Sequence, residues 1–349
     1  MLRKIFWICA VLGVVSLAAG CAATPGLSTA DVMMEEFRVT SDPGIQVYVR
    51  NKRQAGMTQF SAAKTVIFVH GATYPAETAF DLRLDGLSWM DYIAQRGYDV
   101  YLLDVRCYGQ STRPPQMDRP ASENPPFAGT QEAMRDVDAV VEFVKKRRGI
   151  DKVNLLAWSW GTSIMQWYTS LNSHKVEKLV LYAPVWIRQT ASLVQTGPGP
   201  IPAYRSVNMA QAKTRWLTGV PVDKQVDLIP AGWFEAWANA TIASDPVGAK
   251  QNPPVLRAPN GVVADGLNYW GKGVIPWKAE DIKVLIKAEW DQDTPAYMAQ
   301  NLFPKLTGAP YKRYVELGEG THTIIMEKNR MNLFREVQLF LDESHAAAK

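Results

Sequence analysis

Short apolar runs recur along the chain, and they constrain its fold more than any other feature. Within each run the apolar residues are consecutive and often β-branched, which is typical of strands buried on both faces of a sheet. Helical patterns lie between the runs, and strands that alternate with helices form parallel βαβ crossovers. The sequence therefore predicts an α/β fold with a doubly wound, mostly parallel sheet. The predicted strands span residues 65–71, 98–106, 153–158, 178–184, 282–290 and 311–318.

Two further segments have clear local patterns. The stretch "EEFRVTSDPGIQVYVRN", residues 35–51, predicts two strands joined by a Pro-Gly turn. Residues 131–149 predict a helix, because their apolar residues follow helical spacing, basic residues fill the last turn and Gly149 stands at the end.

The alternation of strands and helices stops between residues 185 and 277. This segment has turn signals and short helical patterns but no clear buried strand, and it holds six of the twelve tryptophans. We expect a mainly helical cap here, inserted between two parts of the α/β core, 35–184 and 278–343. Its tryptophans have two interpretations: they line a substrate pocket, or they form the cap's own core. Residues 344–349 are expected to form a frayed tail.

The first twenty residues predict an export signal. A cationic start, "MLRK", precedes a short apolar run and small residues at a processing site. Cys21 follows these residues directly, which resembles a bacterial lipoprotein signal and implies lipidation of Cys21; ordinary secretion and an uncleaved anchor are the alternatives. Ala22 in place of aspartate resembles Gram-negative lipoproteins of the outer membrane. Residues 21–34 then form a tether.

Charge and cysteine content limit the partners and the stabilising bonds. Removal of residues 1–20 takes away Arg3 and Lys4 and leaves 36 basic and 34 acidic residues, a net charge of +2. This balance does not indicate a nucleic acid or an anionic lipid surface as a partner. Cys107 is then the one cysteine besides Cys21, so we expect no intrachain disulfide.

The stretch "LLAWSWGTS", residues 155–163, places a serine where a predicted strand gives way to a helix. A nucleophile on such a tight turn needs small residues two places before and two places after it. These are Ala157 and Gly161, with alanine where glycine is usual. The turn exposes Ser159 above the sheet edge and directs the backbone N–H of Trp160 toward a developing oxyanion.

A serine nucleophile needs a base, and the chain has four histidines. His345 lies in the tail and His174 in a polar loop, so both are expected in solvent. His70 ends a predicted strand, where its backbone is the expected contributor. His322, in the Gly-rich loop "GEGTHT" after the last predicted strand, is therefore the predicted base.

The orienting acid is expected after the predicted strand at 282–290, within the stretch "KAEWDQDTP". Asp291 is preferred because Pro295, four residues later, marks the start of a helix. Asp293 is the second choice, and Glu289 the third because it still belongs to the strand.

From about residue 35 to 343 the chain resembles α/β-hydrolase-fold proteins with a cap domain. The motifs "VHGAT", "DVRCYGQS", "AWSWGT", "AEWDQDTP" and "GEGTH" carry this resemblance, and they appear in the family's order. The resemblance implies a catalytic triad of Ser159, Asp291 and His322. It also implies a second oxyanion donor, the N–H of Ala72, with Thr73 as an alternative. Cys107 stands where the family often has glycine and is expected to be a structural thiol.

The same resemblance limits the reaction. Haloalkane dehalogenases and epoxide hydrolases of this fold use an aspartate nucleophile, so a serine argues against both. Hydrolysis of a carboxylic ester through an acyl-enzyme is the prediction, for a small apolar or aromatic substrate. A proline iminopeptidase-like aminopeptidase, with Glu235 and Asp245 as candidates for binding a free amino terminus, is one alternative. Hydrolysis of a carbon–carbon bond is another, and a non-catalytic binding lipoprotein on the surface is a third.

The expected pocket residues are Thr73, Trp158 and Trp186. No zinc-protease, phosphate-loop or dinucleotide-binding motif is present in the sequence, so neither a metal nor a cofactor is expected.

Overall fold

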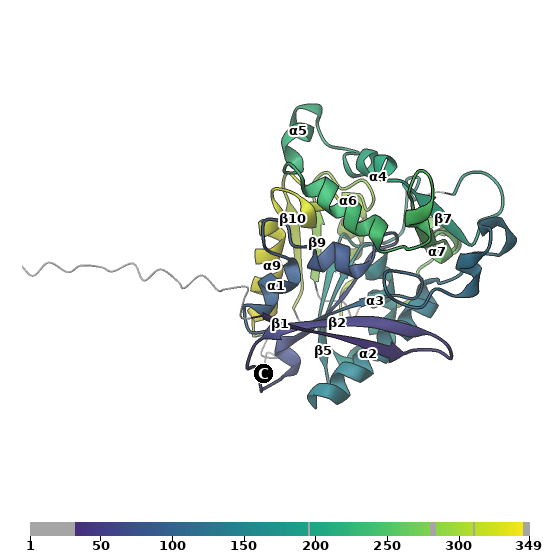
Figure 1. Cartoon of the computed structure of the whole chain (residues 1–349). Coiled ribbons are helices and arrows are strands. Elements are labelled where there is room, and N and C mark those ends of the chain that lie inside the picture. The colour runs from purple at the N-terminus through teal and green to yellow at the C-terminus, as the bar shows by residue number, and fades with distance from the viewer. Residues whose placement is uncertain (1–31, 195, 280–283, 310, 345–349) are drawn as a thin grey trace, which may run out of the picture.

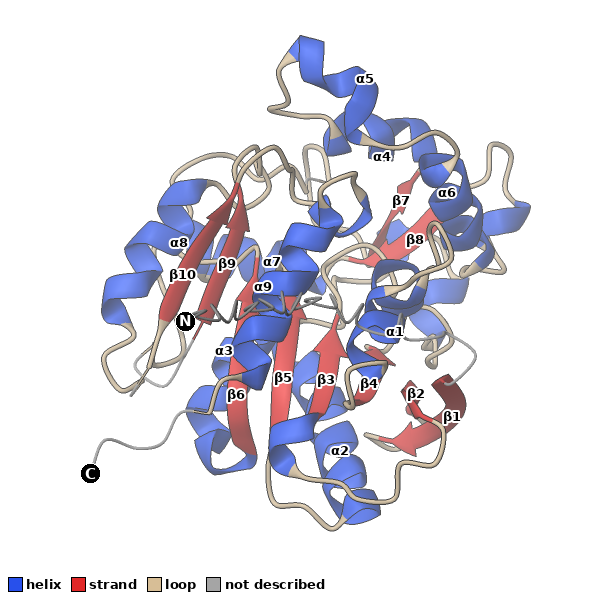
Figure 2. Cartoon of the chain, turned by 90° about the vertical axis from the view of Figure 1, so that its left-hand side faces the viewer, coloured by secondary structure: helices blue, strands red, loops and turns tan. Residues whose placement is uncertain are grey.

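The computed structural model describes residues 32–194, 196–279, 284–309 and 311–344, and an eight-stranded sheet runs through its centre. The hairpin of β1 and β2 lies at one edge of this sheet (Figure 1). The full strand order, which Figure 2 shows, is β1-β2-β4-β3-β5-β6-β9-β10. Strand β2 pairs antiparallel with both β1 and β4, and all pairs from β4 to β10 are parallel. This confirms the predicted doubly wound α/β fold. The strands are β1 (Val32–Thr40), β2 (Gln46–Gln54), β3 (Thr65–Val69), β4 (Asp99–Asp104), β5 (Val153–Trp158), β6 (Val176–Tyr182), β9 (Val284–Ala288) and β10 (Arg313–Leu317).

Helices cover both faces of the sheet, which explains why the central strands are apolar throughout. Along β3, Val66 and Phe68 join one hydrophobic cluster, whereas Ile67 and Val69 join the other, because successive strand residues point to opposite faces. One face carries α1 (Trp89–Ala94) and α9 (Arg330–Asp342), as Figure 2 shows. The other carries α2 (Thr130–Arg148), α3 (Trp160–Asn172) and α8 (Ala296–Leu302).

The segment between β6 and β9 does not add a strand to this sheet. It contains α4 (Met209–Trp216), α5 (Gln225–Leu228), α6 (Trp233–Ala243), α7 (Gly261–Asn268) and a two-stranded sheet of β7 (Tyr204–Val207) and β8 (Leu256–Pro259). In Figure 2, α4, α5 and α6 lie above the tips of the central strands.

One expectation for this segment was wrong, because β8 is a buried strand. Its four residues are too few to give an apolar run, and Arg257 interrupts them. The strand is buried by antiparallel pairing with β7 and by an ion pair between Arg257 and Asp245. That the segment 185–277 is a separate cap domain stays a prediction.

The N-terminal predictions fall largely outside the described residues. Residues 1–20, Cys21 and most of the tether are among those the structure does not describe. The tether was predicted to extend to residue 34, whereas β1 already begins at Val32 and pairs with β2. In the described ranges, no helix combines the length and the apolar character of a membrane span.

Candidate active site

Ser159 lies at the junction of β5 and α3 in a strained backbone conformation. Its φ is 58° and its ψ is −125°, a region that residues other than glycine rarely occupy. The backbone holds this turn, since Ser159 N–H donates to Tyr182 O at 3.0 Å and Thr162 N–H donates to Ser159 O at 2.8 Å. Strain at this point is the expected signature of a nucleophile raised above the end of a strand.

Gly161 is required by the neighbouring strand. A Cβ at this position would lie 2.6 Å from the carbonyl oxygens of both Val69 and His70, at the end of β3. The atoms closest to an added Cβ thus belong to β3 and the residue after it, so the glycine lets α3 start directly against the sheet.

His322 and Asp291 lie in direct contact. His322 Nδ1 is 2.9 Å from Asp291 Oδ2 and 3.0 Å from Oδ1, and both side chains are buried. Thr294 fixes the carboxylate, since its N–H donates to Oδ1 at 2.9 Å and its hydroxyl donates to Oδ2 at 2.7 Å. This network orients the imidazole with Nδ1 toward the acid and leaves Nε2 available.

The surroundings of His322 make its imidazole a stronger base. Burial lowers the pKa of the imidazole, but the carboxylates of Asp291 and Asp293 raise it, and the net result is a pKa above the usual value. The backbone carbonyl of His322 accepts hydrogen bonds from Trp158 Nε1, at 3.0 Å, and from the Tyr182 hydroxyl. Trp158 therefore anchors the histidine loop from beneath.

The other two acid candidates have different partners. Arg215 donates two N–H groups to the Asp293 carboxylate, with Nη2 at 2.6 Å from Oδ1 and Nε at 3.0 Å. Burial raises the pKa of Asp293, but Arg215 and His322 lower it below its usual value. Glu289 is exposed and accepts the backbone N–H of Glu319 at 2.9 Å. Asp291 is thus the acid whose carboxylate bonds to the His322 imidazole.

Ala72 and Trp160, the predicted oxyanion donors, line the same cavity as Ser159. Trp160 is the first residue of α3, where a backbone N–H has no acceptor within the helix. The peptide carbonyl of Ala72 accepts from the Tyr108 hydroxyl at 2.7 Å and from Arg205, which also donates to Thr73 Oγ1 at 2.9 Å. These bonds fix the loop after β3 beside the serine.

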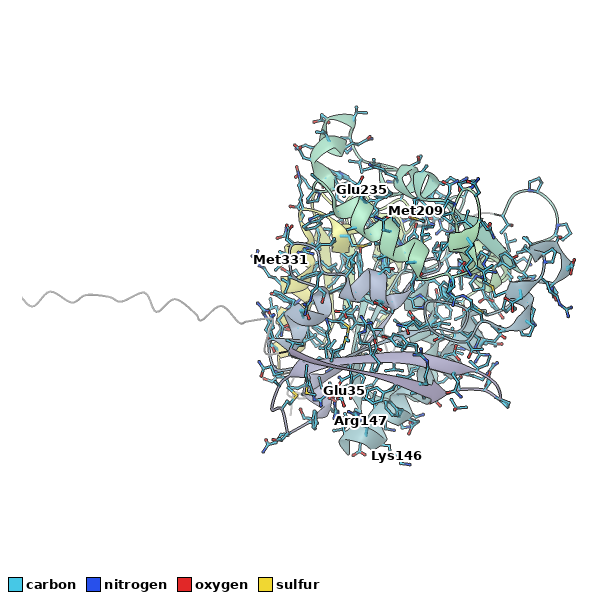
Figure 3. All side chains as sticks on the ribbon, viewed as in Figure 1. Glu35, Lys146, Arg147, Met209, Glu235 and Met331 are labelled. Carbon is cyan, nitrogen blue, oxygen red and sulfur yellow. The ribbon has the colours of Figure 1, made fainter. Side chains whose placement is uncertain are left out.

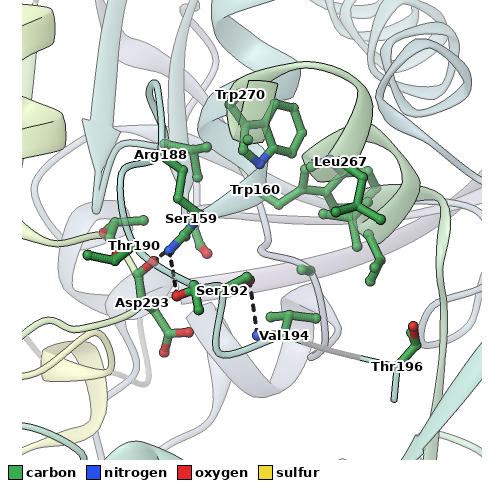
Figure 4. A pocket seen from close by; sticks show the side chains of 18 of the residues that line it. Ser159, Trp160, Arg188, Thr190, Ser192, Val194, Thr196, Leu267, Trp270 and Asp293 are labelled. Atoms are coloured by element: carbon green, nitrogen blue, oxygen red, sulfur yellow. Dashed lines mark hydrogen bonds between the residues drawn. The ribbon is translucent and has the colours of Figure 1, made fainter. Parts of the chain in front are cut away.

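The cavity beside Ser159 has a volume of about 510 Å³ and is drawn in Figure 4. Apolar residues form much of its wall, and hydroxyl groups, two arginines and one carboxylate form the rest. The apolar and aromatic lining includes Ala72, Trp160, Val185, Ala191, Val194, Val262, Val263, Leu267 and Trp270, and the polar lining includes Arg188, Thr190, Ser192, Arg215, Asp293 and Thr294.

The three predicted pocket residues are not among the described residues that line this cavity. Thr73 is buried against Arg205, and Trp158 is buried against the histidine loop. Trp186 packs against Trp277, with ring centroids 6.4 Å apart. The sequence could not show which of the two indoles next to Ser159 faces the cavity, because Trp158 and Trp160 flank the serine on either side. In the structure Trp160 lines the cavity.

Most tryptophans of the segment 185–277 support packing. Trp237 lies between Trp216, at 5.2 Å, and Tyr74, at 4.7 Å, so this cluster joins the segment to the loop after β3. Trp270 is the one of the six that lines the cavity in the described part of the chain. The interpretation of these indoles as core is therefore right for most of them.

Part of the chain matches a known protein family. Residues 64–213, from the start of β3 into α4, match the model of the alpha/beta hydrolase fold. The chain has the alpha/beta hydrolase fold. Ser159 lies within the matched range, whereas Asp291 and His322 lie beyond it. No curated protein shows significant sequence similarity to the chain.

Solved structures share this hydrolase fold at low sequence identity. A serine hydrolase from the polyaromatic-hydrocarbon-degrading bacterium Cycloclasticus zankles aligns at 13% identity with a TM-score of 0.59, covering 89% of this chain and 98% of that one. A laboratory-evolved variant of potato epoxide hydrolase aligns at 18% with a TM-score of 0.58, covering 88% and 99%. The 2-hydroxy-6-oxo-6-phenylhexa-2,4-dienoate hydrolase from Rhodococcus sp. strain RHA1 aligns at 14% with a TM-score of 0.57, also covering 88% and 99%. Identities this low show a common fold alone and carry no information about the substrate.

Two residues of the hydrolase-fold motifs are structural. His70 is fully buried, with Nδ1 2.8 Å from Gly71 O and Nε2 accepting the Val105 N–H at 3.0 Å. Burial lowers the pKa of His70 to about 4, so it is neutral at pH 7. Cys107 is also fully buried, and burial raises the pKa of its thiol, which disfavours the reactive thiolate.

The acidic residues considered for binding a free amino terminus are not in the cavity. Glu235 is exposed on α6, where Figure 3 labels it. Asp245 is buried, with Oδ1 2.8 Å from Arg257 Nη2, so its charge is already neutralised.

Three residues of the site were missed by the sequence analysis. Arg188 and Arg215 line the cavity, and Glu327 is buried beneath the histidine loop. Arg188 could have been found from the sequence, because it is the one charged residue in "APVWIRQT", just after a buried strand. In the described residues, no group of three or more His, Cys, Asp or Glu side chains is arranged to bind a metal ion.

Proposed function

We propose that the protein is a serine hydrolase that cleaves carboxylic esters through an acyl-enzyme intermediate on Ser159. The observation that carries this proposal is the 2.9 Å contact between His322 Nδ1 and Asp291 Oδ2, next to a cavity that Ser159 lines. A base, an acid that orients it and a serine on a strained turn are the parts that acyl transfer requires.

In the first half of the reaction, Ser159 Oγ attacks the ester carbonyl while His322 Nε2 accepts the serine proton. Asp291 stabilises the imidazolium that forms, and the N–H groups of Trp160 and Ala72 bind the oxyanion. The intermediate collapses, and His322 gives its proton to the departing alkoxide. A water molecule then attacks the acyl-enzyme by the same route in reverse, which releases the acid and restores the serine.

An ester is favoured over an amide or a carbon–carbon bond because an alkoxide is a better leaving group than an amide anion or a carbanion, so an ester requires the least from the site. The serine at position 159 argues against the aspartate-based reaction of epoxide hydrolases. Glu235 is exposed and Asp245 pairs with Arg257, so neither residue is available in the cavity to bind the free amino terminus of an aminopeptidase substrate. The mainly apolar cavity suits a small apolar or aromatic group.

Hydrolysis of p-nitrophenyl esters, from acetate to palmitate, tests this proposal. We expect activity in the wild type, and loss of nearly all of it in Ser159→Ala and His322→Ala. The exposed His174 provides a matched control, since His174→Ala removes an imidazole far from the cavity and should retain activity. Activity that survives in Ser159→Ala would contradict an acyl-enzyme on this serine.

We further propose that the protein is exported and anchored through a lipid on Cys21, most simply at the outer membrane. The cationic start, the apolar run and the small residues before Cys21 support this. Labelled palmitate should enter the wild type and be absent from Cys21→Ser; equal labelling of the two would contradict the proposal.

A further inference from the structure

The two arginines that line the cavity differ in their partners. The guanidinium of Arg215 forms an ion pair with Asp293 at 2.6 Å. Arg188 instead donates to two backbone carbonyls, from Nη2 to Asp293 O at 2.6 Å and from Nη1 to Ala191 O at 3.5 Å. In Figure 4, Arg188 reaches Asp293 on one side of the cavity, whereas Leu267 and Trp270 lie on the other side.

Arg188 is left with a buried donor that has no acceptor. Its Nε is inaccessible to solvent and makes no hydrogen bond with any described residue. No carboxylate of the described residues forms an ion pair with it either. Arg188 as a whole is only partly buried, and it lines the cavity. A guanidinium that lines a cavity without a carboxylate partner can bind an anion that enters the cavity.

The nearby acids do not neutralise Arg188. Burial lowers its pKa, Tyr297, Asp293 and Asp291 raise it, and Arg215 lowers it further, so that the pKa lies below the usual arginine value. However, Asp293 already binds Arg215, and Asp291 already binds His322. Among the described residues, no carboxylate thus pairs directly with the Arg188 guanidinium.

We propose that Arg188 binds a carboxylate of the substrate, so that the esters cleaved best are anionic. This rests on the proposed function, since it names the substrate class for the same site. A guanidinium is planar and presents several N–H donors, a geometry that matches a carboxylate. The apolar wall formed by Val262, Leu267 and Trp270 would hold the hydrocarbon part of such a substrate.

The carboxylate belongs either to the acyl part or to the alcohol part of the ester, and matched substrates separate the two. The first pair is mono-p-nitrophenyl adipate and its neutral methyl ester. The second pair is 4-(hexanoyloxy)benzoate and its methyl ester. The ratio of kcat/KM within a pair, anionic over neutral, measures the preference for charge, and the pair with the higher ratio identifies the side.

The variants are Arg188→Gln, which removes the charge, and Arg188→Lys, which retains it. Arg135→Gln is the matched control, because Arg135 is half-exposed on α2 and pairs with Asp42 away from the cavity. We expect the preference to fall about 10- to 100-fold in Arg188→Gln, as for loss of a charged hydrogen bond. It should fall less in Arg188→Lys and stay unchanged in Arg135→Gln. An unchanged preference in Arg188→Gln would overturn the inference.

A binding measurement distinguishes this inference from the proposed function. Calorimetry with monoethyl adipate is carried out on Ser159→Ala and on the double variant Ser159→Ala/Arg188→Gln. Binding to Ser159→Ala that is lost in the double variant supports the carboxylate site. If the wild type then hydrolyses no ester, the proposed function is wrong but the carboxylate site is retained. Equal binding by both variants, beside active hydrolysis of neutral esters by the wild type, would leave the proposed function standing and overturn the carboxylate site.

Discussion

At the scale of single residues, the stretch "AEWDQD" shows what a sequence can settle. It holds three carboxylates within five positions, and the preference for Asp291 rested on spacing to Pro295 alone. The structure gives each acid a different partner: His322 for Asp291, Arg215 for Asp293 and the Glu319 N–H for Glu289. The separation depends on Arg215, which lies 78 positions away in α4, so no local pattern contains it.

We expect Asp291→Asn to lower kcat by about a thousand- to ten-thousand-fold, because the amide no longer stabilises the imidazolium and favours the wrong tautomer. Asp293→Asn should lower kcat less than about tenfold, since this carboxylate bonds to Arg215 rather than to the imidazole. Steady-state kinetics on one p-nitrophenyl ester, with circular dichroism to verify folding, make the comparison. A larger loss in Asp293→Asn than in Asp291→Asn would show that the acid is misassigned.

At the scale of elements, burial on both faces made the central strands predictable, because it leaves consecutive apolar residues. The predicted ranges overlap β3, β4, β5, β6, β9 and β10. The short strand β8 was missed because an ion pair, rather than an apolar run, buries its Arg257. The pocket residues were misplaced for a related reason: a strand's sequence shows that a residue is buried, but not whether it faces a cavity.

The junction of β3 and α3 gives a prediction for stability. In Gly161→Ala the new methyl group would lie 2.6 Å from two backbone carbonyls that cannot move independently of β3. We expect a loss of about 1–3 kcal/mol in the free energy of unfolding, as in overpacked cores, together with reduced esterase activity. Denaturant titration measures the first effect.

Gly318→Ala is the control for this prediction. The nearest atom to its added Cβ is Glu289 Oε2 at 3.7 Å, an ordinary contact, and its φ is not in the left-handed region. Equal stability of Gly161→Ala and the wild type would mean that α3 can shift away from β3 without cost.

At the scale of the whole molecule, the segment between β6 and β9 is hydrogen-bonded to residues around the loop that carries His322. From α4, Trp216 Nε1 donates to Glu327 Oε1 at 2.6 Å, and Glu327 Oε2 accepts the Thr321 N–H at 3.0 Å. Glu327 thus links α4 to the residue just before His322. These contacts span 111 positions, and a glutamate in a chain with 34 acidic residues gives no signal of such a role.

Glu327 makes the stability of this link depend on pH. Burial raises the pKa of its carboxyl from 4.5 to about 7. The negative charge of Asp291 also raises this pKa, whereas the hydrogen bonds from Thr321 and Trp216 lower it. The folded protein therefore binds this proton more tightly than the unfolded chain does. The resulting stability is fully present below pH 4.5 and is lost as pH rises through about 7.

We expect the free energy of unfolding of the wild type to fall, relative to that of Glu327→Gln, as pH rises between about 4.5 and 7. The slope of the difference should approach about 1.4 kcal/mol for each pH unit, since glutamine has no proton to release. Denaturant titrations at several pH values measure it, and Glu235→Gln, an exposed glutamate on α6, should keep the pH dependence of the wild type. Parallel curves for the wild type and Glu327→Gln would mean that Glu327 does not titrate on folding, and that its bonds to Trp216 and Thr321 hold the two parts together equally at every pH.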